Sequence, residues 1–147
     1  MNQAQEVIAC FTITDSFDPA EITRRTGVQP TESWRVGDAH PKRPVKRTSS
    51  RWSLFSRLDI CGAGVEEHIR DIIAQMDQNP EAFQSVSREF GGHIQIVGYC
   101  NTDNHRFNLD PRTVEALARY SLSIGFDLYS VLSDADGKEE PLLKARA

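Results

Sequence analysis

Basic and aromatic side chains gather in one stretch of the sequence, between Trp34 and Trp52. Its candidate binding residues are Trp34, Arg35, Asp38, Lys42, Arg43, Lys46, Arg47 and Arg51. Arg and Lys bind carboxylates and phosphates, and an indole ring stacks on a base or on a cation. The stretch therefore predicts a recognition loop for an acidic protein surface or for single-stranded nucleic acid. A structural interpretation stays open, in which both tryptophans anchor the core and the basic run is solvated.

A second polar stretch runs from Asn101 to Arg106. It could present hydrogen-bonding side chains at the tip of a hairpin, so His105 and Arg106 are also candidate binding residues. Asn and Asp are ordinary turn-forming residues. A purely structural turn is therefore the competing interpretation.

Motifs that would identify an enzyme are missing. The sequence has no G-x-S-x-G nucleophile elbow and no glycine-rich phosphate-binding motif. Its four histidines have no H-x-x-x-H spacing, and its three cysteines form no CxxC pair. We therefore expect a protein that is not an enzyme, with no catalytic residues, no metal and no cofactor.

The elements that must position the basic stretch begin with a strand on either side of it. Residues 7–14 are rich in β-branched and apolar residues at both odd and even positions, which is typical of a central strand covered on both faces. Residues 51–58 alternate instead, and one predicted face holds Trp52, Leu54 and Leu58. Residues 29–49 have no regular pattern and contain several prolines, so we expect a long connection with a short strand around residues 34–36.

Helix signals recur along the rest of the chain. Asp18-Pro19 begins a short helix that Gly27 ends, and Asp110-Pro111 begins another. Apolar residues at helical spacing predict two further helices, over residues 65–76 and 80–90. The repeated Asp-Pro start is a faint sign of two related halves.

The remaining segments complete the predicted fold. Residues 93–100 predict a strand that forms a hairpin with residues 106–108, and residues 126–132 predict the last strand. We expect an α+β fold, with a mostly antiparallel sheet and helices packed on one side, and two related β-α-β (ferredoxin-like) halves would fit it. Residues 1–133 form the single predicted domain, and residues 134–147 an acidic, flexible tail.

Composition and charge narrow the class of protein. The 147 residues are 39% hydrophobic and 26% charged, which is ordinary for one globular domain with a packed core. The formal charge of −4 argues against a protein that coats nucleic acid. No apolar run approaches the roughly 20 residues of a membrane helix, and no signal peptide is recognised. An odd number of cysteines fits reduced thiols, so we expect a cytoplasmic protein without a membrane partner.

Short motifs spread over residues 7–130 resemble a known family. They are Phe11-Thr12-Ile13, Asp18 to Thr23, Gly27 to Thr31, Gly37-Asp38, Trp52-Ser53-Leu54 and Phe126 to Tyr129. In these the chain resembles the bacterial family catalogued as domain of unknown function 4279. The resemblance implies a compact domain of this size and supplies no activity and no catalytic residues.

The leading prediction is a small non-enzymatic binding protein whose partner is another protein. Toxin-neutralising immunity proteins are one such class, by analogy only. The alternative is a module that binds an anion, a nucleotide or single-stranded nucleic acid through the basic loop 35–51. Homo-oligomerisation through an exposed sheet edge is compatible with either function.

Overall fold

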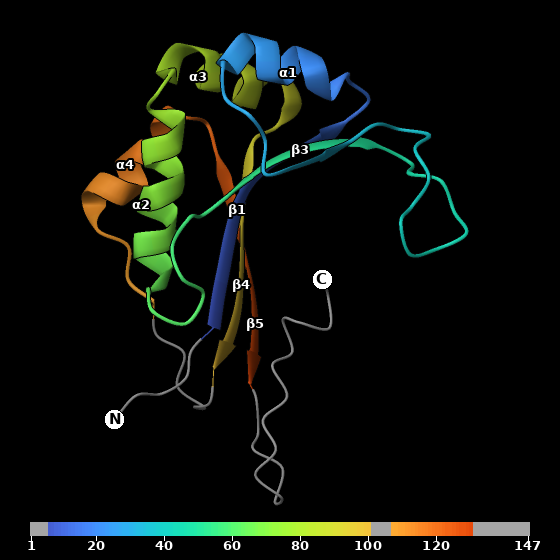
Figure 1. Cartoon of the computed structure of the whole chain (residues 1–147). Coiled ribbons are helices and arrows are strands. Elements are labelled where there is room, and N and C mark those ends of the chain that lie inside the picture. Colours follow the sequence, from blue (N-terminus) through green and yellow to red (C-terminus); the bar gives the residue numbers. More distant parts are fainter. Residues whose placement is uncertain (1–5, 101–106, 131–147) are drawn as a thin grey trace, which may run out of the picture.

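The computed structural model describes residues 6–100 and 107–130, which form a mixed sheet of five strands in the order β2-β3-β1-β4-β5 (Figure 1). The strands are β1 (Glu6–Asp15), β2 (Glu32–Trp34), β3 (Ser50–Phe55), β4 (His93–Cys100) and β5 (Ser123–Ser130). β1 is central and antiparallel to both β3 and β4, and β2 is antiparallel to β3. β5 is parallel to β4.

Four helices cover one face of this sheet and leave the other face without a helix among the described residues (Figure 1). They are α1 (Pro19–Thr26), α2 (Val65–Met76), α3 (Pro80–Phe90) and α4 (Pro111–Arg119). The predicted Asp-Pro starts are confirmed, because Asp18 and Asp110 each accept a hydrogen bond from a backbone N–H of the first turn. Gly27 ends α1 with a φ of 70°, as the sequence predicted.

The core lies between the sheet and the helices. Side chains at alternate positions of β1 point into the core. Phe11 is fully buried, and its ring makes T-shaped contacts with the rings of Trp52 and Phe83. The indole N–H of Trp52 donates to Thr23 Oγ1 at 3.0 Å, so its one polar atom is satisfied. Trp52 is therefore a core anchor, as the structural interpretation of the sequence held.

The predicted α+β class, with a mostly antiparallel sheet and helices on one side, is confirmed. Of the two predicted β-α-β halves, only the second is present as a unit with parallel strands. β4, α4 and β5 form a β-α-β unit with parallel strands. In the first half α1 is followed by the edge strand β2, and the neighbour of β1 is β3, which runs antiparallel to it. Parallel neighbours need a crossover connection, and α4 supplies it.

Three local expectations are wrong. β3 ends at Phe55 because Arg57 turns away to bind Asp71 of α2 through its backbone N–H and guanidinium, and Leu58 is left 37% exposed. Phe107 and Asn108 form no strand, so they form no hairpin with β4. The last strand begins at Ser123 rather than at residue 126.

No helix within residues 6–100 and 107–130 is long and apolar enough to cross a membrane. His105, Arg106 and the predicted acidic tail lie outside the described residues.

Candidate functional site

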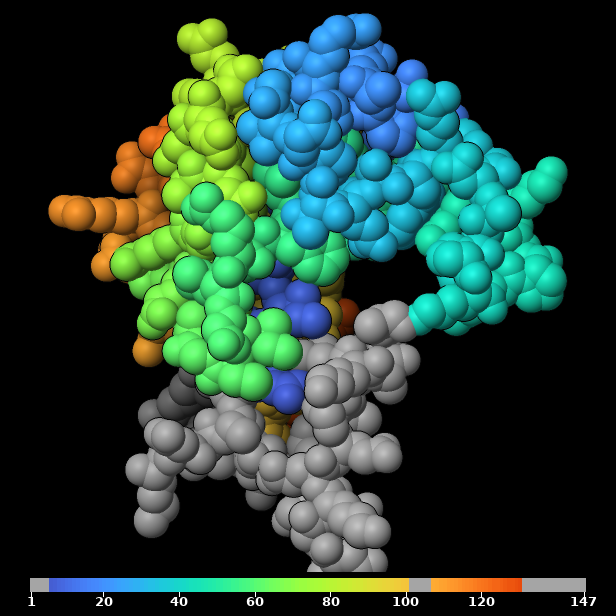
Figure 2. Space-filling view, viewed as in Figure 1, coloured from blue at the N-terminus to red at the C-terminus, as the bar shows by residue number. Residues whose placement is uncertain are grey.

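Residues 35–49, here called the arm, leave the end of β2 and return to β3 as a projecting hairpin (Figure 2). Its two sides are joined by backbone hydrogen bonds of 2.8 to 3.0 Å between Gly37 and Arg47, Asp38 and Arg47, and His40 and Val45. The predicted irregular loop therefore has its own backbone hydrogen bonds. It stands clear of the helical body in the space-filling view (Figure 2).

The base of the arm is fixed by side chains that the sequence supplies locally. The Asp38 carboxylate accepts from the backbone N–H of Arg35 at 2.8 Å, and Gly37 between them has a φ of 90° that favours glycine. The Arg35 guanidinium reaches back to Asp18 at 2.7 Å. Both residues were predicted to bind a partner. Arg35 instead holds the arm to the domain, and Asp38 fixes the turn at its base.

The arm is strongly positive. Residues 35–49 contain five basic residues and one acidic residue, a formal charge of +4. Within the described part of the chain, Arg35 is the only one of these basic residues in an ion pair. Partial burial and the charges of Arg47, Arg43 and Lys42 lower the pKa of His40, as a positive local field should.

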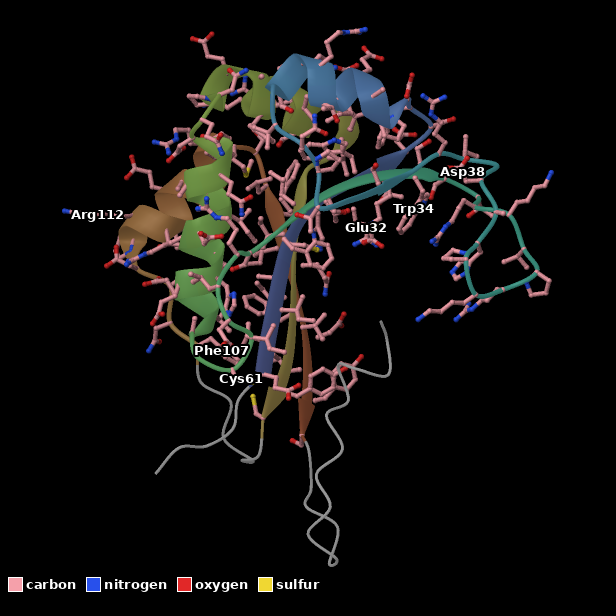
Figure 3. The ribbon with its side chains drawn as sticks, viewed as in Figure 1. Glu32, Trp34, Asp38, Cys61, Phe107 and Arg112 are labelled. Atoms are coloured by element: carbon pink, nitrogen blue, oxygen red, sulfur yellow. The ribbon has the colours of Figure 1, made fainter. Side chains whose placement is uncertain are left out.

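Trp34 lies where the arm meets the sheet. The guanidinium carbon of Arg47 is 3.7 Å from the centre of its ring, and that of Arg51 is 5.3 Å away. These are cation–π contacts, so the arginines use ring surface that a nucleic-acid base would otherwise stack on. Trp34 and the nearby Glu32 lie on the helix-free side of the sheet, near the base of the arm (Figure 3).

The helix-free side of the sheet, here called the open face, continues this site across β3 and β1. Arg51 Nε donates to Ser53 Oγ at 2.9 Å, and Ser53 Oγ is 2.9 Å from Thr12 Oγ1. A second guanidinium nitrogen of Arg51 lies 3.9 Å from Cys10 Sγ. Burial raises the pKa of the Cys10 thiol, and Arg51 only partly opposes this shift. The neutral thiol therefore serves as a packing group beside a well-positioned arginine.

A chain of polar side chains crosses the other half of the open face. His93 Nδ1 is 2.7 Å from Ser123 Oγ, His93 Nε2 is 2.9 Å from Gln95 Oε1, and the Gln95 amide donates to Asp127 at 2.8 Å. Gly125 makes room for it, because a Cβ there would lie 3.0 Å from both His93 and Gln95. The Gln95 amide nitrogen faces Asp127, and its Oε1 therefore faces His93 Nε2.

The arrangement gathers some of the predicted residues and separates others. Trp34, Arg47 and Arg51 are in contact, whereas Lys42, Arg43 and Lys46 lie farther along the arm, on either side of its backbone hydrogen bond between His40 and Val45. The polar chain from Ser123 to Asp127 was not among the predicted sites. The only sequence signal for it was the alternation of His93 and Gln95, and its other half depends on the parallel pairing with β5.

A surface groove of about 530 Å³ lies between α2 and α4 on the helical side. Its charged rim is paired within the protein: Arg70 contacts Glu66 at 3.0 Å, and Arg119 contacts Asp77 at 3.7 Å. Tyr120 also donates to Asp77, and burial with this carboxylate raises the pKa of the tyrosine. The groove therefore presents mostly satisfied charges, unlike the arm.

Comparison with known proteins adds a family assignment. The family model described as "Domain of unknown function (DUF4279)" matches residues 5–131, which confirms the resemblance seen in the sequence motifs. No curated protein and no solved structure matches the chain.

Proposed function

The chain belongs to the DUF4279 family, and we propose that it is a non-enzymatic binding protein whose arm binds an acidic surface of a partner protein. The observation that carries this proposal is the contact of Arg47 with Trp34, where the guanidinium carbon is 3.7 Å from the ring centre, at the base of a hairpin with a formal charge of +4. Arg and Trp are the residue types that most often dominate the energy of protein interfaces.

The site favours a protein over a nucleic acid as the partner. Single-stranded nucleic acid is bound by stacking bases on free aromatic faces along a positive groove. Here Trp52 is fully buried, and Trp34 already contacts Arg47 and Arg51. The arm has a net positive charge of +4, while the chain as a whole carries −4. Such a local patch suits a complementary patch on another protein.

The arm also suits fast and specific association. Its basic side chains lie on one projecting hairpin, so their field extends from one side of the molecule and can orient an acidic partner before contact. The backbone hydrogen bonds within the arm reduce the conformational entropy that binding must remove. We expect the binding rate to fall as salt increases, because surface charges are screened.

The proposed location is the cytoplasm. Neither Cys10 nor Cys61 forms a disulfide, which is consistent with a reducing compartment. Neutralising a toxin, as an immunity protein does, is one form that this binding could take, and it stays a prediction.

The test is a capture experiment from the source cell's lysate, with tagged wild-type protein and a variant in which Lys42, Arg43, Lys46 and Arg47 are all changed to serine. A matched control replaces four arginines on the helices, namely Arg24, Arg88, Arg112 and Arg119, with serine. Both variants lose the same formal charge. The captured protein is then purified and its affinity for all three forms is measured directly.

One protein bound by the wild type and by the helix variant, and weakened by about 2 kcal/mol or more in the arm variant, would support the proposal. Equal binding by all three forms would remove the arm from the interface. Capture of nuclease-sensitive RNA or DNA, with affinity falling log-linearly with salt, would replace the proposal with the nucleic-acid alternative.

A further inference from the structure

The outer edge of β5 is an interaction surface that the arm does not use. β5 pairs with β4 on one side, and no described residue pairs with its other side. None of its eight residues is buried, and Phe126 is 41% exposed. Natural edge strands are commonly guarded by lysine, proline or a bulge. The strand SIGFDLYS contains no lysine or proline, and its one charged residue is Asp127.

The backbone shows which residues offer hydrogen bonds at this edge. The N–H of Ser123 donates to Gly92 at the start of β4. Successive residues of a strand point their N–H and C=O groups to alternate sides. The groups of Ser123, Gly125 and Asp127 therefore face β4, and those of Ile124, Phe126 and Leu128 face outward.

We propose that β5 pairs antiparallel with β5 of a second copy of this chain, with Phe126 opposite its own counterpart on the two-fold axis. Ile124 of each copy then faces Leu128 of the other. All three residues have outward-facing backbone groups, so they form the hydrogen-bonded pairs of an antiparallel ladder. A two-fold interface requires a surface that is complementary to itself, and this register provides it.

Side-chain chemistry favours the same register on both faces. On the helical side it places Phe126 against Phe126 and Ile124 against Leu128, which are apolar pairs of the kind that stabilises neighbouring strands. On the open face it places Asp127 opposite Gly125, so the negative charges of the two copies do not face each other. Phe107 extends the apolar contact, because its ring stacks on that of Phe126 with the ring centres 6.3 Å apart.

The dimer does not depend on what the arm binds, because β2 and β5 are opposite edges of the sheet (Figure 1). Pairing at β5 makes one continuous sheet with an arm at each end. With neighbouring strands about 4.8 Å apart, the two β2 strands would lie roughly 40 Å from each other. Both arms would stay free to bind.

The first test is sedimentation velocity of the full chain over a range of concentrations, in wild type and in Phe126→Lys. We expect the wild type to reach about 33 kDa, twice the 16.5 kDa of one chain, and Phe126→Lys to stay at one chain mass. Val45→Lys is the matched control, because Val45 is an exposed apolar residue of the arm. It should dimerise as the wild type does.

A second test remains decisive if Phe126→Lys misfolds, as circular dichroism would reveal. In a Cys61→Ser background, Phe126→Cys places two thiols across the two-fold axis, where Cα atoms about 5.5 Å apart can form a disulfide. Mild oxidation should cross-link this variant, and Val45→Cys in the same background should stay a single chain.

Several outcomes would overturn the proposal. A wild type that is monomeric at every concentration would leave the edge to residues 131–147 or to a strand of another protein. A dimer that survives Phe126→Lys, or that cross-links equally through residue 45, would use a different surface.

Discussion

The two edges of the sheet present opposite surfaces to solvent. At one edge, β2 is three residues long and leads directly into the arm, with its basic residues and its two prolines at positions 41 and 44. At the other edge, β5 is eight residues long and carries one charge. The first edge repels another copy of itself and attracts acidic surfaces. The second is long and nearly neutral, and the outward backbone groups of Ile124, Phe126 and Leu128 pair with no other described strand.

This difference separates two kinds of binding in one small domain. Charge on a projecting hairpin gives orientation and partner choice, and its strength depends on salt. Backbone pairing at an apolar edge gives a fixed register and depends little on salt. The comparison predicts that the two edges can be inactivated independently, provided that neither of them carries the stability of the fold.

Substituting each of the two tryptophans tests whether the arm edge carries the stability of the fold, and this pair has the largest expected effect. Trp52 is fully buried among Phe11 and Phe83, so Trp52→Ala should lower the free energy of unfolding by about 3–5 kcal/mol. Trp34→Ala should cost no more than about 1 kcal/mol of stability, the range of a partly desolvated cation–π contact, yet weaken partner binding. Urea unfolding of both variants measures the difference. Equal losses of stability would mean that the arm belongs to the core.

Gly92 tests how tightly the β5 edge is attached. A Cβ at this position would lie 2.6 Å from Ser87 Oγ and 2.9 Å from a Leu122 methyl carbon, and the Gly92 carbonyl accepts from Ser123 where β5 begins. Gly92→Ala should therefore destabilise the fold by about 1–3 kcal/mol, the usual cost of overpacking.

The control for Gly92 is Gly64→Ala. Gly64 has a φ of −81° and no atom within 4 Å of an added Cβ, so its effect should be much smaller in the same unfolding assay. If both substitutions are equally tolerated, the contact between β5 and the end of α3 is looser than these distances imply.

Local signals in the sequence were enough to find most helices and strands. Asp-Pro pairs and a following glycine predicted where α1 begins and ends and where α4 begins, because capping chemistry acts within a few residues. Alternation placed Trp52 and Leu54 inside. It failed at Leu58, since a pattern of period two cannot show that Arg57 leaves the sheet to bind Asp71.

Long-range pairing was the part that the sequence could not supply. Nothing local distinguishes a hairpin partner of β4 from a parallel one, and the parallel pairing with β5 is what brings Ser123 to His93. In the arm, the residue types predicted positive charge correctly, but not that Arg47 covers Trp34 or that Arg35 is used to anchor the arm. Those contacts depend on how the hairpin folds back on itself.

A buried histidine beyond the end of β3 that lies away from the arm makes the stability of the fold depend on pH. Beyond the end away from the arm, Ser56 Oγ lies 2.7 Å from Nδ1 of the buried His68, whose Nε2 has no hydrogen-bond partner among the described residues. Burial lowers the pKa of His68, although Glu67, Asp71 and Asp59 oppose the shift. The unfolded chain thus binds a proton more readily than the folded one just below the ordinary histidine pKa.

The free energy of unfolding should therefore decrease as pH falls below about 6.5, the ordinary value for histidine. Urea unfolding at a series of pH values measures this, and His68→Gln should flatten that part of the profile. The sedimentation coefficient of the folded dimer should not change with pH in the way that the free energy of unfolding does. A profile unchanged by His68→Gln would assign the pH dependence to other groups.

The smallest expected effect concerns the ion pair that ties the arm to the domain. Arg35 and Asp18 are 2.7 Å apart, but their side chains are 58% and 50% exposed, so water and salt screen the attraction. The same Asp18 oxygen also accepts from the backbone N–H of Ala20 at the start of α1. Asp18→Ala would therefore mix the loss of a helix cap, worth about 1 kcal/mol, with the loss of the ion pair.

Asp18→Asn keeps a capping oxygen and removes the charge, so it can be combined with Arg35→Met in a double-mutant cycle. We expect a coupling energy of about 0.2–1 kcal/mol that decreases with salt. Partner affinity should fall more than this stability term does, because the ion pair orients the base of the arm. A coupling energy of several kcal/mol would make the arm part of the cooperative fold and would remove the contrast between the two edges. A coupling of zero with unchanged affinity would show that the hydrogen bonds within the arm are sufficient to hold it in place.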